Sequence, residues 1–368
     1  MTSLSAQVEA SLPVVEQWRV RAVCVPLDEP HRTASGVITE SPLVLTDVVT
    51  DSGVVGHSVL FTYTRAALGP TADLVRNLGA LVQGERLAPA EIEHRLTGRF
   101  KLLGTQGLVG MALAALDMAL WDALARLHGC SLCALLGFSA KPVRAYGAIG
   151  YDGVQGSAAV AERWLKRGFT GVKAKIGYPT AAEDLAVVRA IRKAVGDQAS
   201  VMVDYNQSLS PSEATERLRC LDEEGLTWIE EPTLAHDYAG HAHIARETRT
   251  PIQCGENWWG VRDIQHAIEA QASDYMMPDV MKIGGVTGWM RGAALAHSRA
   301  IPVSNHLWSE ISAQLLSCTP TAHWLEYCDW WNPILSDPLR IERGSTQIDG
   351  VLGTGVSWNE SAVSKFSV

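Results

Sequence analysis

The first part of the chain has a pattern of apolar and polar residues that favours strands. β-forming residues cluster or alternate with polar ones in two segments, and a Ser52-Gly53 turn precedes a third segment. The three predicted strands are Trp18 to Pro26, Leu43 to Asp47 and Val54 to Tyr63. Between the first two lies a polar, turn-rich stretch from Asp28 to Gly36, for which we expect a mobile loop.

Helical periodicity follows, and strands then alternate with helices to near the C-terminus. Apolar residues recur at helical spacing in Ala72 to Val82, Ala90 to Leu96 and, most strongly, Leu108 to His128. From Val143 onward we count eight strand-like segments, beginning near residues 143, 171, 200, 227, 251, 275, 302 and 323. The first half is therefore typical of an α+β domain, and the eight alternating units favour a parallel (β/α)8 barrel over a doubly wound sheet.

The composition is that of a folded protein with a large core. Of 368 residues 47% are hydrophobic and 19% charged, and 31 basic against 40 acidic residues give a net charge of −9. The absence of a basic run argues against nucleic acid or an anionic membrane as a partner and favours a small molecule. Met1 to Leu12 lack the pattern of a signal peptide, and we find no apolar run long enough to span a membrane, so we expect the cytoplasm.

Seven cysteines are scattered along the chain. An odd, scattered set fits buried reduced thiols better than a disulfide framework. Cys130 and Cys133 form a C-x-x-C pattern, which also occurs in redox and zinc sites, but no second Cys or His pair lies at zinc-site spacing.

Three of the predicted strands end on equally spaced carboxylates. Asp204, Glu230 and Glu256 follow one another at intervals of 26 residues, about the length of one strand, one helix and two loops. We therefore expect them at equivalent places in three successive βα units. Converging carboxylates repel one another unless a hard divalent cation neutralises them, and oxygen ligands suit Mg²⁺. The alternative is that each carboxylate caps the following helix, but the equal spacing of all three favours the metal site.

The second barrel strand carries a pair of lysines. Lys173 and Lys175 lie two residues apart and therefore point the same way, toward the barrel interior or its mouth. Two ammonium groups held close lower each other's pKa, which can leave one neutral and able to act as a base near pH 7. The alternative is a pair of solvated surface lysines, which the apolar residues around them disfavour.

The last three barrel strands end on further ionisable residues. Asp279 on the sixth strand and His306 on the seventh can form a pair in which the carboxylate fixes the imidazole tautomer and raises its basicity. A single histidine at a strand end is more often a structural hydrogen-bond partner. Glu326 lies beside Trp324 and Leu325 on the eighth strand, so we expect it to stay protonated and to donate a hydrogen bond to a developing oxyanion.

Together these motifs resemble the signature set of the mandelate racemase subgroup of the enolase superfamily. The likeness covers nearly the whole chain, and the order and spacing of the motifs make it specific. The motifs are Gly171-Val172-Lys173-Ala174-Lys175-Ile176-Gly177, Val203-Asp204-Tyr205-Asn206-Gln207, Trp228-Ile229-Glu230-Glu231-Pro232, Gly255-Glu256-Asn257, Pro278-Asp279, Met281-Lys282-Ile283-Gly284-Gly285 and Leu325-Glu326.

The resemblance implies a fold and a metal site. It implies an α+β capping domain at residues 1–138, a modified (β/α)7β barrel at 139–340 and a C-terminal segment at 341–368 that returns to the capping domain. It also implies Mg²⁺ on the three carboxylates, with Asn206 close to the metal ligands and Lys282 supporting the site electrostatically.

The resemblance further implies catalytic roles. Lys175 would be the base on one face of the substrate, with Lys173 beside it near the substrate carboxylate, and the His306–Asp279 pair would serve the opposite face. Glu326 would donate to the enolate oxygen. A proton α to a carboxylate is too weakly acidic for such bases unless the enediolate is stabilised, which Mg²⁺, Lys173 and Glu326 would do.

The segments expected to contact the substrate differ from those of mandelate racemases. Pro30 to Ile38 are largely polar where those enzymes present valines, and Ala148 stands where they have a serine that binds the substrate carboxylate. We therefore take His31, Arg32 and Ala148 as candidate substrate-binding residues for a more polar, hydroxylated acid, together with Tyr63. The alternative is that the loop is exposed and that His31 never meets the substrate.

The sequence thus predicts a Mg²⁺-dependent enzyme that removes the α-proton of a small hydroxycarboxylate. Bases on both faces would give racemisation or epimerisation. The same intermediate can expel a β-hydroxyl, so dehydration of an acid sugar or another β-hydroxy acid to a 2-keto acid is the alternative.

Two other classes of protein fit the sequence less well. A catalytically silent barrel kept for binding or assembly would have lost a metal ligand or both bases, and this chain retains them all. A nucleotide-dependent enzyme would need a G-x-G-x-x-G or P-loop motif, and the sequence has neither.

By its family likeness we also expect a homo-oligomer, with an octamer as one form. The Trp258-Trp259 and Trp330-Trp331 pairs are candidates for subunit contacts, for a pocket or for the core.

Overall fold

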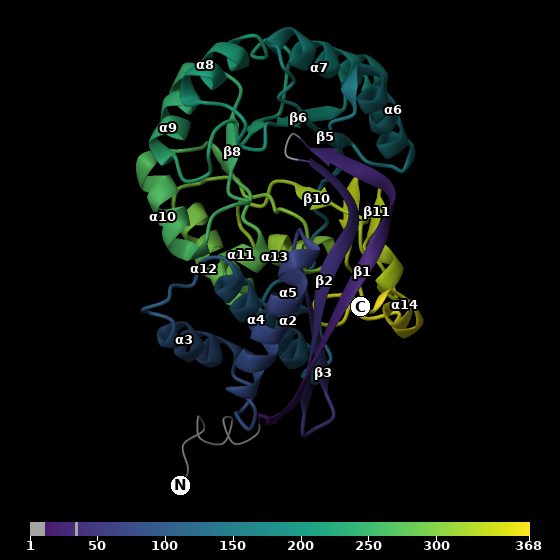
Figure 1. Cartoon of the computed structure of the whole chain (residues 1–368), viewed down its shortest axis with the longest axis vertical. Coiled ribbons are helices and arrows are strands. Elements are labelled where there is room, and N and C mark those ends of the chain that lie inside the picture. Colours follow the sequence, from purple (N-terminus) through teal and green to yellow (C-terminus); the bar gives the residue numbers. More distant parts are fainter. Residues whose placement is uncertain (1–11, 34–35) are drawn as a thin grey trace.

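The computed structural model describes residues 12–33 and 36–368, which form a cap of strands and helices against a barrel ringed by helices (Figure 1). Residues 1–11, for which the sequence predicts no signal peptide, and Ala34 and Ser35 of the predicted capping loop lie outside the described residues.

The cap is built on an antiparallel sheet with the strand order β1-β2-β3. Helix α4 packs against this sheet, and its alanine-rich surface allows a close approach. A Cβ at Gly56 would lie 2.2 Å from the carbonyl oxygen of Ala119, so only glycine fits there. The elements of the cap are β1 (Val15–Thr33), β2 (Gly36–Thr50), β3 (Val55–Phe61), α2 (Arg65–Ala80), α3 (Pro89–Arg99), α4 (Leu108–Leu127) and α5 (Leu132–Leu135).

The stretch from Asp28 to Gly36 does not form the mobile loop that we predicted, as far as it is described. Asp28–Thr33 continue β1 and Gly36 begins β2. After an irregularity between Pro26 and His31, the pairs are His31 with Ile38, Arg32 with Val37 and Thr33 with Gly36. Pairing with the returning strand overrides the low β propensity of these polar residues. The long hairpin reaches the barrel mouth (Figure 1), where the Tyr151 amide donates to the carbonyl of Arg32 (2.8 Å).

Helix α4 is long and apolar enough to cross a membrane by length and composition, with a mean hydropathy of 1.6, although it is not an uninterrupted apolar run. The helix carries Asp117 and Asp122, and 78% of its most apolar 18-residue stretch is buried inside the protein. It is therefore the core helix of the cap.

The barrel has seven parallel strands among the described residues, in the order β10-β4-β5-β6-β7-β8-β9. The eighth expected strand, near residue 302, is present as isolated bridges from Val303 to Met276 and to Ala322, which close the barrel between β9 and β10. The predicted (β/α)7β barrel with an α+β cap is confirmed. The strands are β4 (Ala145–Ile149), β5 (Gly171–Lys175), β6 (Ser200–Asp204), β7 (Ile229–Glu230), β8 (Ile252–Cys254), β9 (Tyr275–Met276) and β10 (Leu325–Tyr327).

Helices surround the strands as a ring (Figure 1). Their starts follow from local sequence; for example, Thr180 and Glu183 form a capping box at the start of α7. The helices are α6 (Gly153–Lys166), α7 (Ala181–Val195), α8 (Pro211–Arg219), α9 (Tyr238–Glu247), α10 (Gly260–Ala270), α11 (Val280–Ile283), α12 (Gly285–Ser298) and α13 (Ser309–Ser317).

Two levels of side chains fill the barrel. The lower level is an apolar cluster of Tyr146, Met202, Trp228 and Trp324. Alternate residues of a strand share a face, so two positions further along the same strands the side chains again point inward. This upper level is charged. Asp204, Glu230 and Glu326 stand two residues after Met202, Trp228 and Trp324. Lys173, Lys175 and Glu256 belong to it by contact, since Lys173 pairs with Glu230 and Glu326, Lys175 with Asp204, and Glu256 clusters with Asp204 and Glu230.

The C-terminal segment returns to the cap. The indole of Trp358 donates to Asp47 (2.6 Å), and the amide of Val368 donates to the carbonyl of Ala22 (3.2 Å). The 3-10 helix η1 (Asn332–Ile334) precedes this segment, and β11 (Arg340–Glu342) leads into it. The segment itself contains β12 (Ser345–Gln347) and α14 (Glu360–Phe366).

Candidate active site

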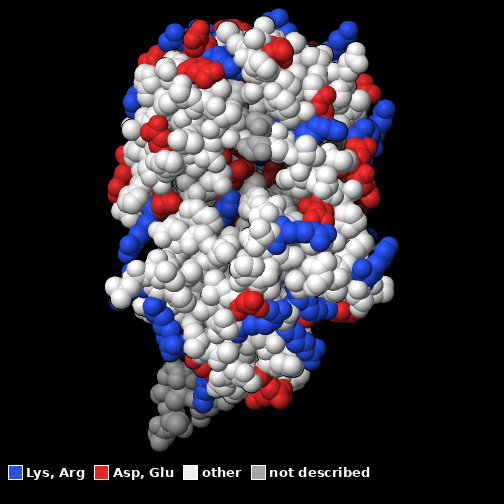
Figure 2. Space-filling view, viewed as in Figure 1, with Lys and Arg blue, Asp and Glu red and all other residues white. Residues whose placement is uncertain are grey.

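The strand-end residues singled out in the sequence gather at one end of the barrel, beside the hairpin of β1 and β2. Figure 2 shows a hollow in this face of the molecule, with acidic and basic side chains at its floor. Elsewhere on this face positive and negative side chains are interspersed, so it carries no basic patch of the kind that binds nucleic acid.

Asp204, Glu230 and Glu256 form a buried cluster in which one oxygen of each lies within 4.8 Å of the others. They do not cap the following helices, because Ser210 caps α8, Asp237 caps α9 and α10 has no side-chain cap. The donor set is three hard oxygens, and Oε2 of Glu256 is buried without a hydrogen bond. This arrangement fits Mg²⁺. Among the described residues it is the one such group of His, Cys, Asp and Glu side chains, and Cys130 and Cys133 do not belong to it.

The two lysines of β5 are paired with these carboxylates. Lys175 contacts Asp204, and Nζ of Lys173 donates to Glu230 (2.5 Å) and Glu326 (2.8 Å). Burial lowers the pKa of Lys175 and Lys173 lowers it further, but Asp204, Glu256 and Glu230 together outweigh them and raise that pKa above its ordinary value. Burial likewise lowers and Glu230 raises the pKa of Lys173, with a net increase. Of the predicted mutual depression, the lowering of the pKa of Lys175 by Lys173 is present, and it is smaller than the combined effect of the carboxylates.

Glu326 differs from its prediction. Burial raises the pKa of Glu326, but the ammonium of Lys173 and then His306 outweigh burial and lower it to about 2. The amide of Leu307 also donates to its Oε2 (3.0 Å). The carboxyl group is thus ionised rather than protonated, because its neighbours in space are cationic although its neighbours in sequence are apolar.

His306 and Asp279 form the predicted pair, with 2.7 Å between Nδ1 and Oδ2. The other oxygen of Asp279 accepts from the indole of Trp308 (2.9 Å) and from the amide of Met281 (2.7 Å), which fixes the carboxylate. Burial lowers the pKa of His306, but Glu256 and Asp279 outweigh burial and raise it. We did not predict the contribution of Trp308, for which the signal was an aromatic residue two positions after the histidine.

The two candidate bases flank the carboxylate cluster. Lys175 contacts Asp204 on β6, whereas Nε2 of His306 lies 3.4 Å from Glu256, which follows β8. Because β7 lies between β6 and β8, the ammonium and the imidazole stand at opposite ends of the row of carboxylates.

Asn206 and Lys282 also lie at the cluster. The amide and the side-chain nitrogen of Asn206 donate to Asp204 (2.6 and 3.2 Å), with Asn206 in a left-handed conformation (φ 46°). Lys282 donates to Asn257 (2.8 Å), which in turn donates to Glu256 (3.1 Å). Sequence reasoning did not assign a role to Asn257, although its place directly after Glu256 was a signal.

The four candidate substrate-binding residues differ in how they lie relative to the carboxylate cluster. Lys282 lies over the ring of Tyr63 (4.9 Å), which brings Tyr63 to the site. The His31 ring packs on Trp330 (4.9 Å between centroids), and burial, followed by the charge of Lys175, lowers the pKa of His31 to about 3. His31 is therefore neutral, and it stays a candidate substrate-binding residue.

Ala148 on β4 pairs with Lys173 on β5, so one strand separates it from Asp204 on β6. Arg32 is 55% exposed and lies 3.6 Å from Asp152, outside the cluster. Of the aromatic pairs, Trp258 and Trp331 belong to the core, whereas Trp330 contacts His31.

Two family models match the chain. The model for the mandelate racemase / muconate lactonizing enzyme N-terminal domain covers residues 16–137, and the enolase C-terminal domain-like model covers residues 156–362. The chain belongs to the mandelate racemase/muconate lactonizing enzyme family of the enolase superfamily.

Relatives of known activity belong to several reaction classes. The chain is 30% identical to L-talarate/galactarate dehydratase of Salmonella typhimurium over 338 residues, covering 88% of this chain and 82% of the relative. It is 28% identical to L-Ala-D/L-Glu epimerase of Bacillus subtilis over 288 residues, covering 75% and 76%. These relatives make the chain an enzyme of the racemase, epimerase or dehydratase type.

A solved structure supports the cofactor. An enolase from Bradyrhizobium, complexed with magnesium and mandelic acid, is 44% identical, superposes with a TM-score of 0.92 and covers 97% of this chain and 99% of its own. Since several solved relatives contain magnesium, Mg²⁺ is the cofactor of this family, and a small carboxylate is the class of ligand that its active site binds.

Proposed function

We propose that this enzyme removes the α-proton of a hydroxycarboxylate and returns a proton from the opposite side, giving racemisation or epimerisation. The observation that carries the proposal is the placement of Lys175 and His306 at opposite ends of the carboxylate row. A substrate bound over that row would present one face to each base.

The chain's own residues take the following roles in the proposal. Asp204, Glu230 and Glu256 hold Mg²⁺, which when bound stabilises the enediolate and offsets the charge of the carboxylates. Asn206 orients Asp204, and Lys282 supports Glu256 through Asn257. Lys173, held between Glu230 and Glu326, supplies a fixed positive charge for the substrate carboxylate.

Which of the two bases removes the proton depends on the stereoisomer that is bound. Lys175 takes the proton from one isomer after it has released the proton that Asp204 stabilises, and His306 donates to the opposite face. The reverse holds for the other isomer. Asp279, fixed by Trp308, holds the imidazole so that Nε2 faces the substrate. Glu326 becomes a donor to the enolate oxygen only after it takes up a proton, because Lys173 keeps it ionised.

Dehydration of a β-hydroxy acid is the second candidate. It is supported by the polar residues at the mouth, such as His31 and Arg32, and by the dehydratases among the relatives. In that reaction one base removes the α-proton, and a protonated His306 or Lys175 delivers a proton to the departing β-hydroxyl.

Proton NMR in D₂O with Mg²⁺, on a panel of chiral 2-hydroxy acids and sugar acids, tests the proposal. We expect the α-proton signal to disappear with the carbon skeleton intact, and Lys175→Ala and His306→Asn each to abolish exchange of one stereoisomer. A 2-keto-3-deoxy product would establish dehydration instead. No exchange with any acid would refute both reactions.

We further propose a cytoplasmic homo-oligomer, with an octamer as the form to test, and the division into residues 1–138, 139–340 and 341–368. The seven free cysteines suit a reducing compartment. Light scattering at several protein concentrations gives the oligomeric state.

A further inference from the structure

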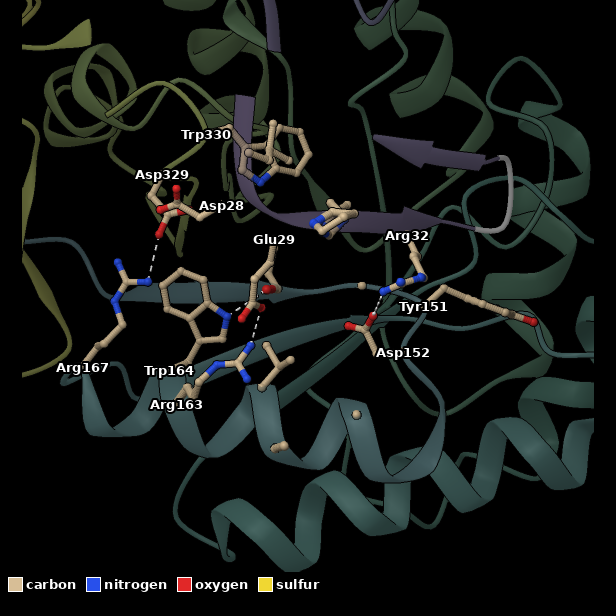
Figure 3. A pocket seen from close by; sticks show the side chains of 18 of the residues that line it. Asp28, Glu29, Arg32, Tyr151, Asp152, Arg163, Trp164, Arg167, Asp329 and Trp330 are labelled. Atoms are coloured by element: carbon tan, nitrogen blue, oxygen red, sulfur yellow. Dashed lines mark hydrogen bonds and ion pairs between the residues drawn. The ribbon is translucent and has the colours of Figure 1, made fainter. Parts of the chain in front are cut away.

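A groove of about 1170 Å³ lies beside the catalytic residues, large for a small-molecule site (Figure 3). Three segments that are distant in sequence form it. The end of β1 from Pro26 to Arg32 forms one wall, α6 forms another, and the segment from Asp329 to Pro333 closes it.

The inner end of the groove adjoins the active site. Ala148 lines the groove and pairs with Lys173, so it stands one strand away from a catalytic group. His31 lines the groove as well, with its ring packed on that of Trp330, another lining residue (4.9 Å between centroids). The tail of a substrate held over the carboxylate row would therefore enter the groove on the side of Ala148, next to Lys173.

Charged side chains line the groove in pairs rather than as a patch of one sign. Figure 3 shows three arginines, each directed at a carboxylate. Arg163 contacts Glu29 (2.6 Å), Arg167 contacts Asp329 (2.8 Å) and Arg32 lies 3.6 Å from Asp152. Asp28 is a fourth lining carboxylate, and no arginine of the described groove lies within ion-pair distance of it. The lining therefore has a net charge of about −1 with His31 neutral.

We infer that the groove binds the neutral, polyhydroxylated tail of a monocarboxylic sugar acid, an inference that rests on the proposed function. Hydroxyl groups donate hydrogen bonds to carboxylates and accept them from guanidinium groups. A polyol tail can therefore bind to the arginine–carboxylate pairs that line the groove without adding charge to the groove. A second carboxylate on the tail would meet Asp28 and arginines whose charge is already compensated. An aromatic tail would remove these charged groups from water without replacing their hydrogen bonds. The structure thus favours aldonates over aldarates and over aryl hydroxy acids.

Equilibrium binding tests the inference without requiring turnover. Calorimetry with Mg²⁺ would compare C5 and C6 aldonates of all configurations, the aldarates of the same lengths, mandelate and lactate. We expect the best aldonate to bind at least tenfold more tightly than its aldarate or lactate. Ala159 is an exposed residue of α6 that lines the groove, and Ala159→Trp would fill it. The ratio of aldonate to lactate affinity should then fall at least tenfold.

Matched controls separate filling of the groove from general damage. Ala186→Trp places the same side chain at an exposed position of α7 that does not line the groove, and should leave the ratio unchanged. Arg163→Met should lower the ratio, whereas Arg189→Met, which breaks the exposed pair with Glu224, should not. Thermal melting of each variant checks that it folds.

The outcomes distinguish this inference from the proposed function. Aldarates binding as tightly as aldonates, equal effects of the two tryptophan variants, or no aldonate binding would overturn the groove assignment. Aldonate binding that depends on Ala159, with no α-proton exchange in D₂O, would support the groove and refute the proposed reaction. Exchange of the α-proton of short acids, without tighter binding of aldonates, would support the proposed reaction and refute the groove assignment.

Discussion

The lower and upper levels of the barrel interior lie on the same strands and differ in almost every physical property. Met202 is followed two residues later by Asp204, Trp228 by Glu230 and Trp324 by Glu326. The lower side chains form an apolar cluster, whereas the upper ones are buried ionisable groups paired with one another. One step of two residues along a strand therefore separates packing from chemistry.

The difference shows what the upper level lacks. Asp204, Glu230, Glu256 and Glu326 are opposed by Lys173 and Lys175, which leaves two negative charges, the charge of one divalent cation. Burial, with Asp204 and Glu256, raises the pKa of Glu230 well above its ordinary value even though Lys173 opposes this. The lower level is complete as it stands, but the upper level is complete only with a cation.

Glu256→Gln should give the largest effect and separates the two levels most clearly. We expect α-proton exchange to fall by roughly a thousandfold or more, since the enediolate loses its main stabilisation. Without Mg²⁺, the melting temperature should stay the same or rise, because a buried repulsion is removed. A large loss of stability without Mg²⁺ would mean that the carboxylate holds the fold together.

Met202→Ala should show the reverse pattern in the lower level. Removing this buried side chain should lower the free energy of unfolding by about 2 to 5 kcal/mol, measured by urea denaturation, because it leaves a cavity. The control Met202→Leu keeps the volume and should cost less than about 1.5 kcal/mol. At a temperature where Met202→Ala remains folded, its exchange rate should far exceed that of Glu256→Gln; equal rates would break the distinction between the levels.

Asp117 extends the comparison to a buried carboxylate outside the barrel. On α4, it accepts from the amide (3.0 Å) and the hydroxyl (2.5 Å) of Thr287, at the contact between cap and barrel. Burial raises the pKa of Asp117 from 3.8 to about 7, although the hydrogen bonds from Thr287 lower it.

The consequence is a smaller effect that depends on pH. Between about pH 4 and pH 7 the folded protein holds a proton that the unfolded chain has released. Asp117 therefore contributes stability below pH 4 that is lost as the pH rises to 7, at about 1.4 kcal/mol per pH unit. Urea denaturation across this range should show a flatter pH dependence for Asp117→Asn than for the wild type. Parallel curves would contradict this assignment.

The barrel and its cluster were predictable from sequence because both depend on regular spacing. Strands and helices alternate at a constant interval, which puts Asp204, Glu230 and Glu256 at equivalent ends. The hairpin from Asp28 onward was not predictable in the same way, since its strand conformation depends on pairing with β2 rather than on its own residues.

Whether a side chain is ionised, and where a cavity forms, depend on contacts between residues that are far apart in the sequence. Glu326 is ionised because barrel closure brings it to Lys173, 153 positions earlier in the chain. The groove is formed by segments near residues 30, 160 and 330, and no local pattern links them.

Calorimetric titration of Mg²⁺ into the metal-free protein tests the central claim most directly. We predict one Mg²⁺ bound per chain by the wild-type protein and at least a hundredfold weaker binding by Glu256→Gln. No binding by the wild-type protein, or equal affinity in the two proteins, would contradict the assignment of the upper level as a divalent-cation site.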